Sequence, residues 1–147
     1  MTPAIVLTDN PSAADREAVV KGLIAFNNAV IGPSGWRPLA VLVKDPATGQ
    51  TLGGLTGATF HGWLFVEVLW LPEALRRGGI GSRLIRQAED EATRRGCCGV
   101  LLDTYSFQAR GFYEKLGYRV FGTLDDAPPG YQRFYLQKRL ADLTRGD

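Results

Sequence analysis

Residues 69–82 read LWLPEALRRGGIGS, and this stretch decides the fold. It begins inside an apolar run, WLFVEVLWL over residues 63–71, which Pro72 ends. The run is too short to cross a membrane and is rich in aromatic and branched side chains, which indicates a buried central strand. After the glycines, apolar residues recur at helical spacing and polar residues occupy the opposite face. We therefore predict a strand, a glycine-rich turn and a helix that begins near Gly79, with the apolar stripe Ile80, Leu84, Ile85, Ala88 and Ala92 and the polar face Arg83, Arg86, Gln87, Glu89, Asp90 and Glu91.

The turn combines the features of a phosphate-binding site. The first turn of a helix leaves backbone N–H groups without partners and carries partial positive charge. Gly78, Gly79 and Gly81 would let a ligand approach the main chain closely, and Arg76 and Arg77 add two cations. A pyrophosphate therefore suits this loop better than any other class of ligand.

Two well-known phosphate-binding motifs match this sequence poorly. The ATP or GTP loop requires Lys-Ser or Lys-Thr after the glycines, and neither pair follows them here. The dinucleotide fingerprint requires a glycine or alanine at position 84, where this chain has Leu84, although Asp103 lies at about the distance of the ribose-binding acid. Dinucleotide binding is the runner-up, and it predicts affinity for NAD and none for CoA.

Two blocks of sequence resemble the GNAT superfamily of acetyl-CoA-dependent N-acetyltransferases. The loop RRGGIG over residues 76–81 resembles the family's cofactor loop, [QR]-x-x-G-x-[GA], placed after a strand and before a helix. About thirty residues later, SFQARGFYEKLGY over residues 106–118 resembles the second block, N-x-x-A-x-x-x-Y-E-K-x-G-[FY]. The departure is Ser106, where the family usually has Asn, and a Ser hydroxyl can still donate a hydrogen bond. The resemblance implies cofactor contacts at Leu69, Leu71, Arg76, Arg77, Gly78, Gly79, Ile80, Gly81, Ser82 and Ser106.

The remaining elements alternate along the chain. We expect strands over residues 4–8, 39–44, 51–60, 99–105, 118–124 and 131–140, helices from Ser12 and over residues 108–116, and a frayed tail over residues 141–147. This order predicts an α/β (α+β) fold with helices packed on the faces of a mixed sheet. The resemblance implies a GNAT-like, mostly antiparallel sheet of six to seven strands with helices on both faces. In that fold the central strands splay apart at the cofactor, so Leu69 and Leu71 would offer it main-chain groups.

Composition limits the class of protein. The 147 residues suit a single domain, 1–147, and the amino terminus lacks the regions of a signal peptide, so we expect a cytoplasmic protein without membrane contact. A net charge of +2 is too balanced to indicate nucleic-acid binding. His61 is the single histidine, and the adjacent Cys97 and Cys98 have the character of small buried thiols, so we expect no metal site. The sequence leaves open whether the chain forms a homodimer.

Glu67 and Tyr113 are the candidate catalytic residues. Glu67 is the only charged residue in the apolar run, and a carboxylate inside a central strand must be paired, hydrated or protonated. It is a candidate general base, or else it pairs structurally with an arginine such as Arg37. The resemblance implies that Tyr113 protonates the departing thiolate, whereas its spacing with Ala109, Phe112 and Leu116 also fits simple packing.

Three further residues are candidates for binding the acceptor. Asn27 is in phase with the apolar stripe of the first helix, which indicates either a buried hydrogen bond or a pocket-lining contact. Trp36 lies in a loop rich in glycine and proline, and Tyr131 lies on the last strand; either aromatic ring could wall the acceptor site or only pack at an edge.

The function that these observations predict is transfer of acetyl from acetyl-CoA directly to a primary amine of a small molecule, peptide or protein. The alternative is a non-catalytic sensor or assembly module that binds acyl-CoA without turnover. The sequence does not identify the amine, because the segments that would shape its pocket show the least recognisable sequence pattern.

Overall fold

The structure is a computed structural model that describes residues 1–140; the predicted tail over residues 141–147 lies outside the described residues. The chain divides into two compact units, Met1–Ser34 and Gly35–Asp147. Among the described residues, no helix is long and apolar enough to cross a membrane.

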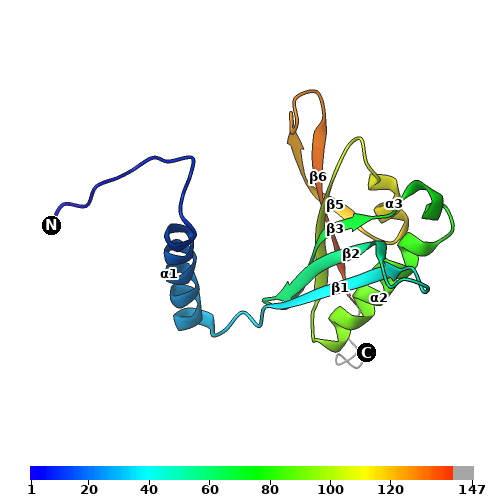
Figure 1. Cartoon of the computed structure of the whole chain (residues 1–147), viewed down its shortest axis with the longest axis horizontal. Helices are drawn as coiled ribbons and strands as arrows, with labels where there is room; N and C mark the ends of the chain where they lie inside the picture. Colours follow the sequence, from blue (N-terminus) through cyan, green and yellow to red (C-terminus); the bar gives the residue numbers. More distant parts are fainter. Residues whose placement is uncertain (141–147) are drawn as a thin grey trace. The chain divides into compact units, whose positions relative to one another are not determined.

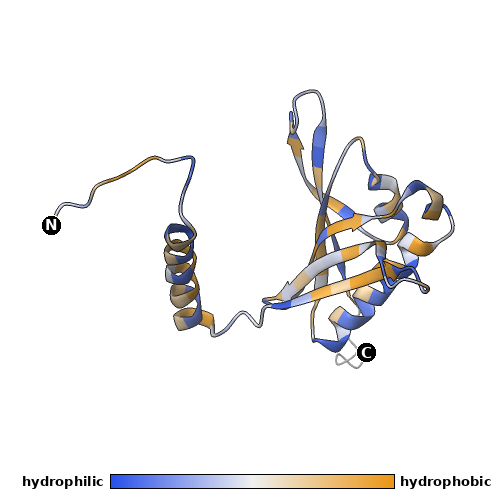
Figure 2. Ribbon diagram, in the orientation of Figure 1, coloured by the Kyte–Doolittle hydropathy of each residue, from blue (hydrophilic) through white to orange (hydrophobic). Residues whose placement is uncertain are grey.

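The first unit contains the helix α1 (Ala13–Ile31) (Figure 1). Ser12 begins it with a capping box, in which the Ser12 hydroxyl accepts from the N–H of Asp15 and the Asp15 carboxylate accepts from the N–H of Ser12. The strand expected over residues 4–8 is wrong, because this apolar segment, visible in Figure 2, forms no strand pairing within the described residues. A strand exists only where a neighbouring strand accepts and donates its backbone hydrogen bonds.

The second unit is built on a six-stranded sheet with the order β1-β2-β3-β4-β6-β5. The strands are β1 (Arg37–Lys44), β2 (Thr51–Phe60), β3 (Trp63–Trp70), β4 (Gly99–Tyr105), β5 (Arg119–Asp125) and β6 (Gln132–Arg139). The pair of β3 and β4 is parallel and the other four pairs are antiparallel. The predicted α/β class with a mixed, mostly antiparallel sheet is confirmed.

The helices of the second unit are α2 (Ile80–Arg94) and α3 (Arg110–Lys115), with a short 3₁₀ turn, η1 (Glu73–Leu75), before α2. Helix α2 places Leu84, Ile85, Ala88 and Ala92 in the core, as the apolar spacing predicts. The placement of Glu89 on the exposed face is wrong, since this residue is buried too. The fully buried side chains Leu55, Leu64, Val100, Leu102, Ile85 and Leu136 join the inner strands to α2 in one core.

The parallel pair of central strands is short, and this positions the site. Within the described residues, β3 pairs with β4 only where Trp63, Leu64 and Phe65 face Gly99, Val100 and Leu101. Both strands continue beyond that point, β3 to Trp70 and β4 to Tyr105, without pairing with each other. The predicted splay of the central strands is therefore confirmed, and it leaves the β4 side of β3 open over residues 66–70.

A β-bulge lies on the same strand at Glu67. Gly57 pairs with Val66 and Thr56 pairs with Val68, so Glu67 is the extra residue on β3. Gly57 permits the close approach of the two strands, because a Cβ there would collide with the carbonyl oxygen of Phe65. The bulge re-aims the side chains that follow it along β3.

Candidate active site

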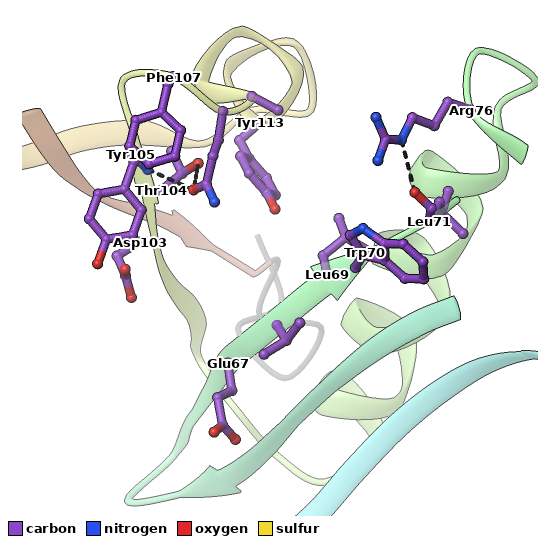
Figure 3. A pocket seen from close by; sticks show the side chains of 13 residues that line it. Glu67, Leu69, Trp70, Leu71, Arg76, Asp103, Thr104, Tyr105, Phe107 and Tyr113 are labelled. Carbon is purple, nitrogen blue, oxygen red and sulfur yellow. Dashed lines mark hydrogen bonds between the residues drawn. The ribbon is translucent and has the colours of Figure 1, made fainter. Parts of the chain in front are cut away.

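A cavity of about 600 Å³ occupies the gap between the splayed strands β3 and β4. Figure 3 shows residues of β3 on one side of it, residues of β4 and the following loop on the other, and Tyr113 of α3 beside them. The cavity is lined by Glu67, Val68, Leu69, Trp70, Leu71, Arg76, Asp103, Thr104, Tyr105, Phe107, Gln108, Ala109 and Tyr113. It thus brings together both candidate catalytic residues and three of the candidate cofactor residues, Leu69, Leu71 and Arg76.

The glycine-rich loop gives α2 an open N-terminus. Gly79 is the N-cap residue and has a left-handed backbone (φ 83°), and no side chain caps the helix. Arg77 also has a positive φ of 65°, and its guanidinium lies 3.7 Å from the carboxylate of Glu73 on the surface. A side chain at Gly78 would meet no atom within 4 Å, so the loop offers open space beside the first turn.

Gly81 has a structural role beside the one predicted for it. A Cβ at this position would lie 3.2 Å from the ring of Phe112 in α3. The missing side chain therefore lets α3 pack against the first turn of α2. Figure 3 shows Arg76 beside Leu71, and Nε of Arg76 donates to the carbonyl oxygen of Leu71 at 2.8 Å. That carbonyl oxygen thus already accepts one hydrogen bond within the protein, and it has a second lone pair that a ligand could use.

Tyr113 is 8% exposed, and its hydroxyl points into the space between β3 and β4 (Figure 3). Burial, and secondarily the charge of Asp103, raise the pKa of this phenol to about 12. The phenol is therefore protonated throughout the neutral range and can donate a hydrogen bond or a proton to a group in the cavity.

Glu67 is exposed, contrary to the burial that its apolar neighbours indicate. Alternation along β3 places Glu67 with Trp63 and Phe65, on the face opposite the buried Leu64 and Val66, and the bulge leaves it without a partner residue on β2. Figure 3 shows the Glu67 carboxylate on the β3 side of the cavity, away from Arg76, and Asp103 on the opposite, β4 side. The structure shows no ion pair between Glu67 and Arg37 within the described residues.

Polar and aromatic groups that the sequence did not assign to the active site line its β4 side; Asp103 was considered only as a ribose-binding acid. The carboxylate of Asp103 accepts from Nε of Arg133 at 2.8 Å, and this guanidinium lies over the ring of Tyr105. The amide oxygen of Gln108 accepts from the N–H of Tyr105 at 2.8 Å. The alternation along β4, which places Leu101, Asp103 and Tyr105 on one face, is the signal that could have found Asp103.

The other candidates lie outside the cavity lining. Ser106 joins β4 to the start of β6, because its hydroxyl accepts from the N–H of Gln132 at 3.0 Å. Tyr131 is 49% exposed and packs edge to face on Phe107, which in turn stacks on Tyr105. Trp36 is exposed before β1, and Asn27 belongs to the first unit. The remaining loop residues, Arg77, Gly78, Gly79, Ile80, Gly81 and Ser82, are likewise absent from the lining.

The cysteines have no part in this site. Cys97 is buried, and burial raises the pKa of its thiol, whereas Cys98 is exposed, contrary to expectation. Cys98 is exposed because Gly96 ends α2 and the chain leaves the core for one residue before β4 begins. Among the described residues, no group of three or more His, Cys, Asp or Glu side chains could hold a metal ion.

Comparisons with known proteins agree with this geometry. A model of the acetyltransferase (GNAT) family matches residues 17–118. The chain is 38% identical over 134 residues to an acetyltransferase of Agrobacterium fabrum, covering 91% of this chain and 97% of the relative. It is 43% identical over 107 residues to a blasticidin-S acetyltransferase of Streptomyces morookaense, covering 71% and 79%.

Among solved structures, one from Agrobacterium tumefaciens that is described as an acetyltransferase superposes with a TM-score of 0.88 at 36% identity. The match covers 93% of this chain and 99% of that one. A central gap, a glycine-rich helix start and a tyrosine directed into the gap thus occur in a sequence whose relatives are acetyltransferases. The chain belongs to the acetyltransferase (GNAT) family.

Proposed function

We propose that the protein is an N-acetyltransferase that transfers acetyl from acetyl-CoA directly to a primary amine. The observation that carries the proposal is the cavity between β3 and β4, which is lined by an exposed carboxylate, a buried phenol and Arg76, a residue of the glycine-rich loop that precedes α2. A non-catalytic module would need the loop but not the carboxylate and phenol together.

The residues present fit acetyl-CoA. The uncapped start of α2 and Arg76 and Arg77 would hold its phosphates. The unpaired side of β3 at Leu69 would pair with one of its amide groups, and the main chain of Leu71, just after β3, would face its thioester. When bound, acetyl-CoA supplies an activated acetyl thioester.

Each candidate residue has a defined task in the transfer. Glu67 takes a proton from the attacking amine, directly or through water, and the N–H of Leu71 polarises the carbonyl oxygen under attack. The C–N bond forms as the C–S bond breaks, and Tyr113 supplies hydrogen bonding or a proton to the departing sulfur. No covalent bond to the enzyme is needed, and the cysteines take no part.

The acceptor that the site favours is a cationic amine. The Glu67 carboxylate is exposed on the β3 side, and the ring of Phe107 on the opposite side, 56% exposed, offers a face for a cation. Since one relative is a blasticidin-S acetyltransferase, blasticidin S is the first acceptor to test. Aminoglycosides, polyamines, lysine side chains and protein N-termini complete the panel.

The test is release of free CoA thiol from acetyl-CoA over this panel of amines, with mass spectrometry of the product. A mass increase of one acetyl group on an amine supports the proposal. Binding of acetyl-CoA without turnover of any amine would favour the sensor or assembly module. Affinity for NAD without affinity for CoA would favour the dinucleotide alternative.

Glu67→Gln tests the general base. The variant keeps size and hydrogen bonding but cannot accept a proton, so kcat should fall about 10²- to 10⁴-fold with acetyl-CoA affinity nearly unchanged. Glu114→Gln is the control, because it removes a carboxylate from an exposed ion pair on α3. A Glu67→Gln enzyme with the wild-type rate would show that the proton leaves by another route.

We also propose that the protein is cytoplasmic, as the absence of signal-peptide features in the sequence predicts. Sedimentation equilibrium of the full chain decides between a monomer and the homodimer that the sequence leaves open.

A further inference from the structure

A buried polar cluster joins α2, the end of α3 and β6 behind the catalytic cavity. Glu89 of α2 is 9% exposed, and its carboxylate accepts from the hydroxyl of Tyr118 at 2.7 Å. Nζ of Lys138 on β6 donates to the same carboxylate at 3.1 Å. The side chain of Lys138 also lies over Gly117 and the ring of Tyr118, so the cluster is closed by packing as well as by charge.

Tyr118 connects this cluster to the catalytic phenol in two ways. Its N–H donates to the carbonyl oxygen of Tyr113 at 3.1 Å, and the N–H of Gly117 (φ 95°) donates to the carbonyl oxygen of Glu114 at 3.1 Å. This pair of bonds is a Schellman motif, which ends α3 in a fixed geometry. The rings of Tyr118 and Tyr113 also pack edge to face, with centroids 6.0 Å apart.

The other end of the connection is the helix that begins at the glycine-rich loop. Glu89 lies about two and a half turns along α2 from Ile80. A path of one side-chain hydrogen bond, one backbone hydrogen bond and one ring contact therefore joins the rigid body of α2 to Tyr113. Helix α3 is only six residues long, so these contacts supply a large part of its positional restraint.

We propose that Glu89 and Tyr118 are positioning residues, which fix α3 against α2 so that the Tyr113 hydroxyl is directed at the reacting atoms. The inference rests on the proposed function, because it assigns Tyr113 a part in the reaction. Neither residue lines the cavity, so neither touches the substrates.

Stability alone does not require this arrangement. Replacing a buried ion pair with apolar side chains of similar volume is often neutral or stabilising, because the charges lose hydration when they are buried. Apolar side chains pack without direction, whereas a hydrogen bond has a preferred distance and angle. The tyrosine–carboxylate bond therefore adds directional restraint to the packing around α3, and a small displacement of a catalytic group can lower kcat by as much as about 10²-fold.

Tyr118→Phe is the first variant, because it removes the hydroxyl, keeps the ring against Tyr113 and leaves Glu89 paired with Lys138. We expect kcat to fall about 10-fold, with KM for acetyl-CoA within about twofold of wild type. Asp90→Asn is the matched control: it removes the carboxylate of the next residue on α2, which is exposed, and kcat should not change.

A double-variant cycle separates positioning from packing. In a Tyr113→Phe background, Tyr118→Phe should have no further effect on kcat, because the hydroxyl that it orients is already absent. A further 10-fold loss in that background would overturn the inference. So would a Tyr118→Phe enzyme with the wild-type kcat.

Glu89→Met combined with Lys138→Met and Tyr118→Phe keeps the test decisive if Tyr118→Phe alone folds poorly. This triple variant removes both charges together with the hydroxyl that would lose its acceptor, and it fills their volume, so its thermal midpoint should stay near that of wild type while kcat falls about 10-fold. A lowered thermal midpoint with unchanged kcat would show a purely structural cluster. If Tyr113→Phe is itself as fast as wild type, the proposed role of Tyr113 fails; if it is slow and the Tyr118 and Glu89 variants are fast, only this inference fails.

Discussion

Replacing Tyr113 with phenylalanine removes the phenol that is directed into the cavity and keeps the ring that packs against Tyr118. The magnitude follows from the pKa of about 12 that burial gives this phenol. A thiol has a pKa of about 8.5, so complete transfer of the phenolic proton to a thiolate is uphill by roughly 3.5 units, or about 5 kcal/mol. The phenol therefore assists chiefly by donating a strong hydrogen bond to the sulfur as its charge develops.

A hydrogen bond to a charged group contributes about 1.5–3 kcal/mol, which corresponds to a factor of about 10 to 150 in rate. We expect kcat of Tyr113→Phe to fall by that factor, with little change in acetyl-CoA affinity or in the thermal midpoint. Since the phenol ionises near pH 12, it should produce no alkaline limb in kcat between pH 7 and 10.

The assay is steady-state release of CoA thiol from pH 6 to 10 for both enzymes, with the amine acceptor saturating. A loss of less than about threefold would place the phenol in a packing role only. An alkaline limb near pH 8–9 that disappears in the Phe variant would refute the argument differently, because it would show that the phenol of the working enzyme ionises far below pH 12.

Three further predictions concern the loop and the stability of the fold. Gly78→Glu places a negative charge in the open space beside the first turn of α2, so acetyl-CoA affinity by calorimetry should fall about 10-fold or more, whereas Gly78→Gln should bind nearly as well as wild type; equal affinities of the two variants would remove the phosphates from this loop. Arg95→Met should lower the free energy of unfolding in urea by about 2–3 kcal/mol, because this half-buried guanidinium donates to Pro38, Thr59 and Glu91, and Arg94→Met on the exposed side should change it by less than about 0.5 kcal/mol. The folded-state pKa of Tyr113 exceeds its unfolded value near 10, so the stability contributed by its protonated form is complete below pH 10 and is lost as pH rises through about 12; the urea midpoint should therefore fall less between pH 9 and 11.5 in Tyr113→Phe than in wild type, and equal falls would contradict this.

The sequence predicts those parts of the fold that local patterns determine. The apolar run and the glycine-rich turn located β3, the loop and α2, because strand period, helix period and turn chemistry all act within a few residues. The capping box at Ser12 located the start of α1 for the same reason. Strand pairing depends on distant partners, and residues 4–8 show the consequence: an apolar stretch with strand-like composition forms no strand there.

The residues of the candidate site likewise fall into those that local motifs identify and those that only the folded chain brings together. Arg76 and Tyr113 were identified from motifs, and the structure places both at the cavity. Asp103 was considered only as a ribose-binding acid, and Arg133 and Gln108 were missed, because Arg133 reaches Asp103 only after β4 pairs with β6 and Gln108 reaches Tyr105 only after the following loop folds back. Glu67 was found, but its exposure was not, because the run around it is almost wholly apolar, whereas the alternation places Glu67 on the face opposite the buried Leu64 and Val66.

Glu89 shows why a helical pattern alone cannot locate a buried charge. It follows Ala88 directly and lies at the margin of the apolar stripe, so its spacing fits either face of α2. What decides its position is the pair of donors that reach it from Tyr118 and Lys138, 29 and 49 residues later in the chain. Burial of a carboxylate without such donors would cost several kcal/mol. The buried position of Glu89 is therefore a property of the assembled core, and it becomes predictable only once β6 and the end of α3 are placed beside α2.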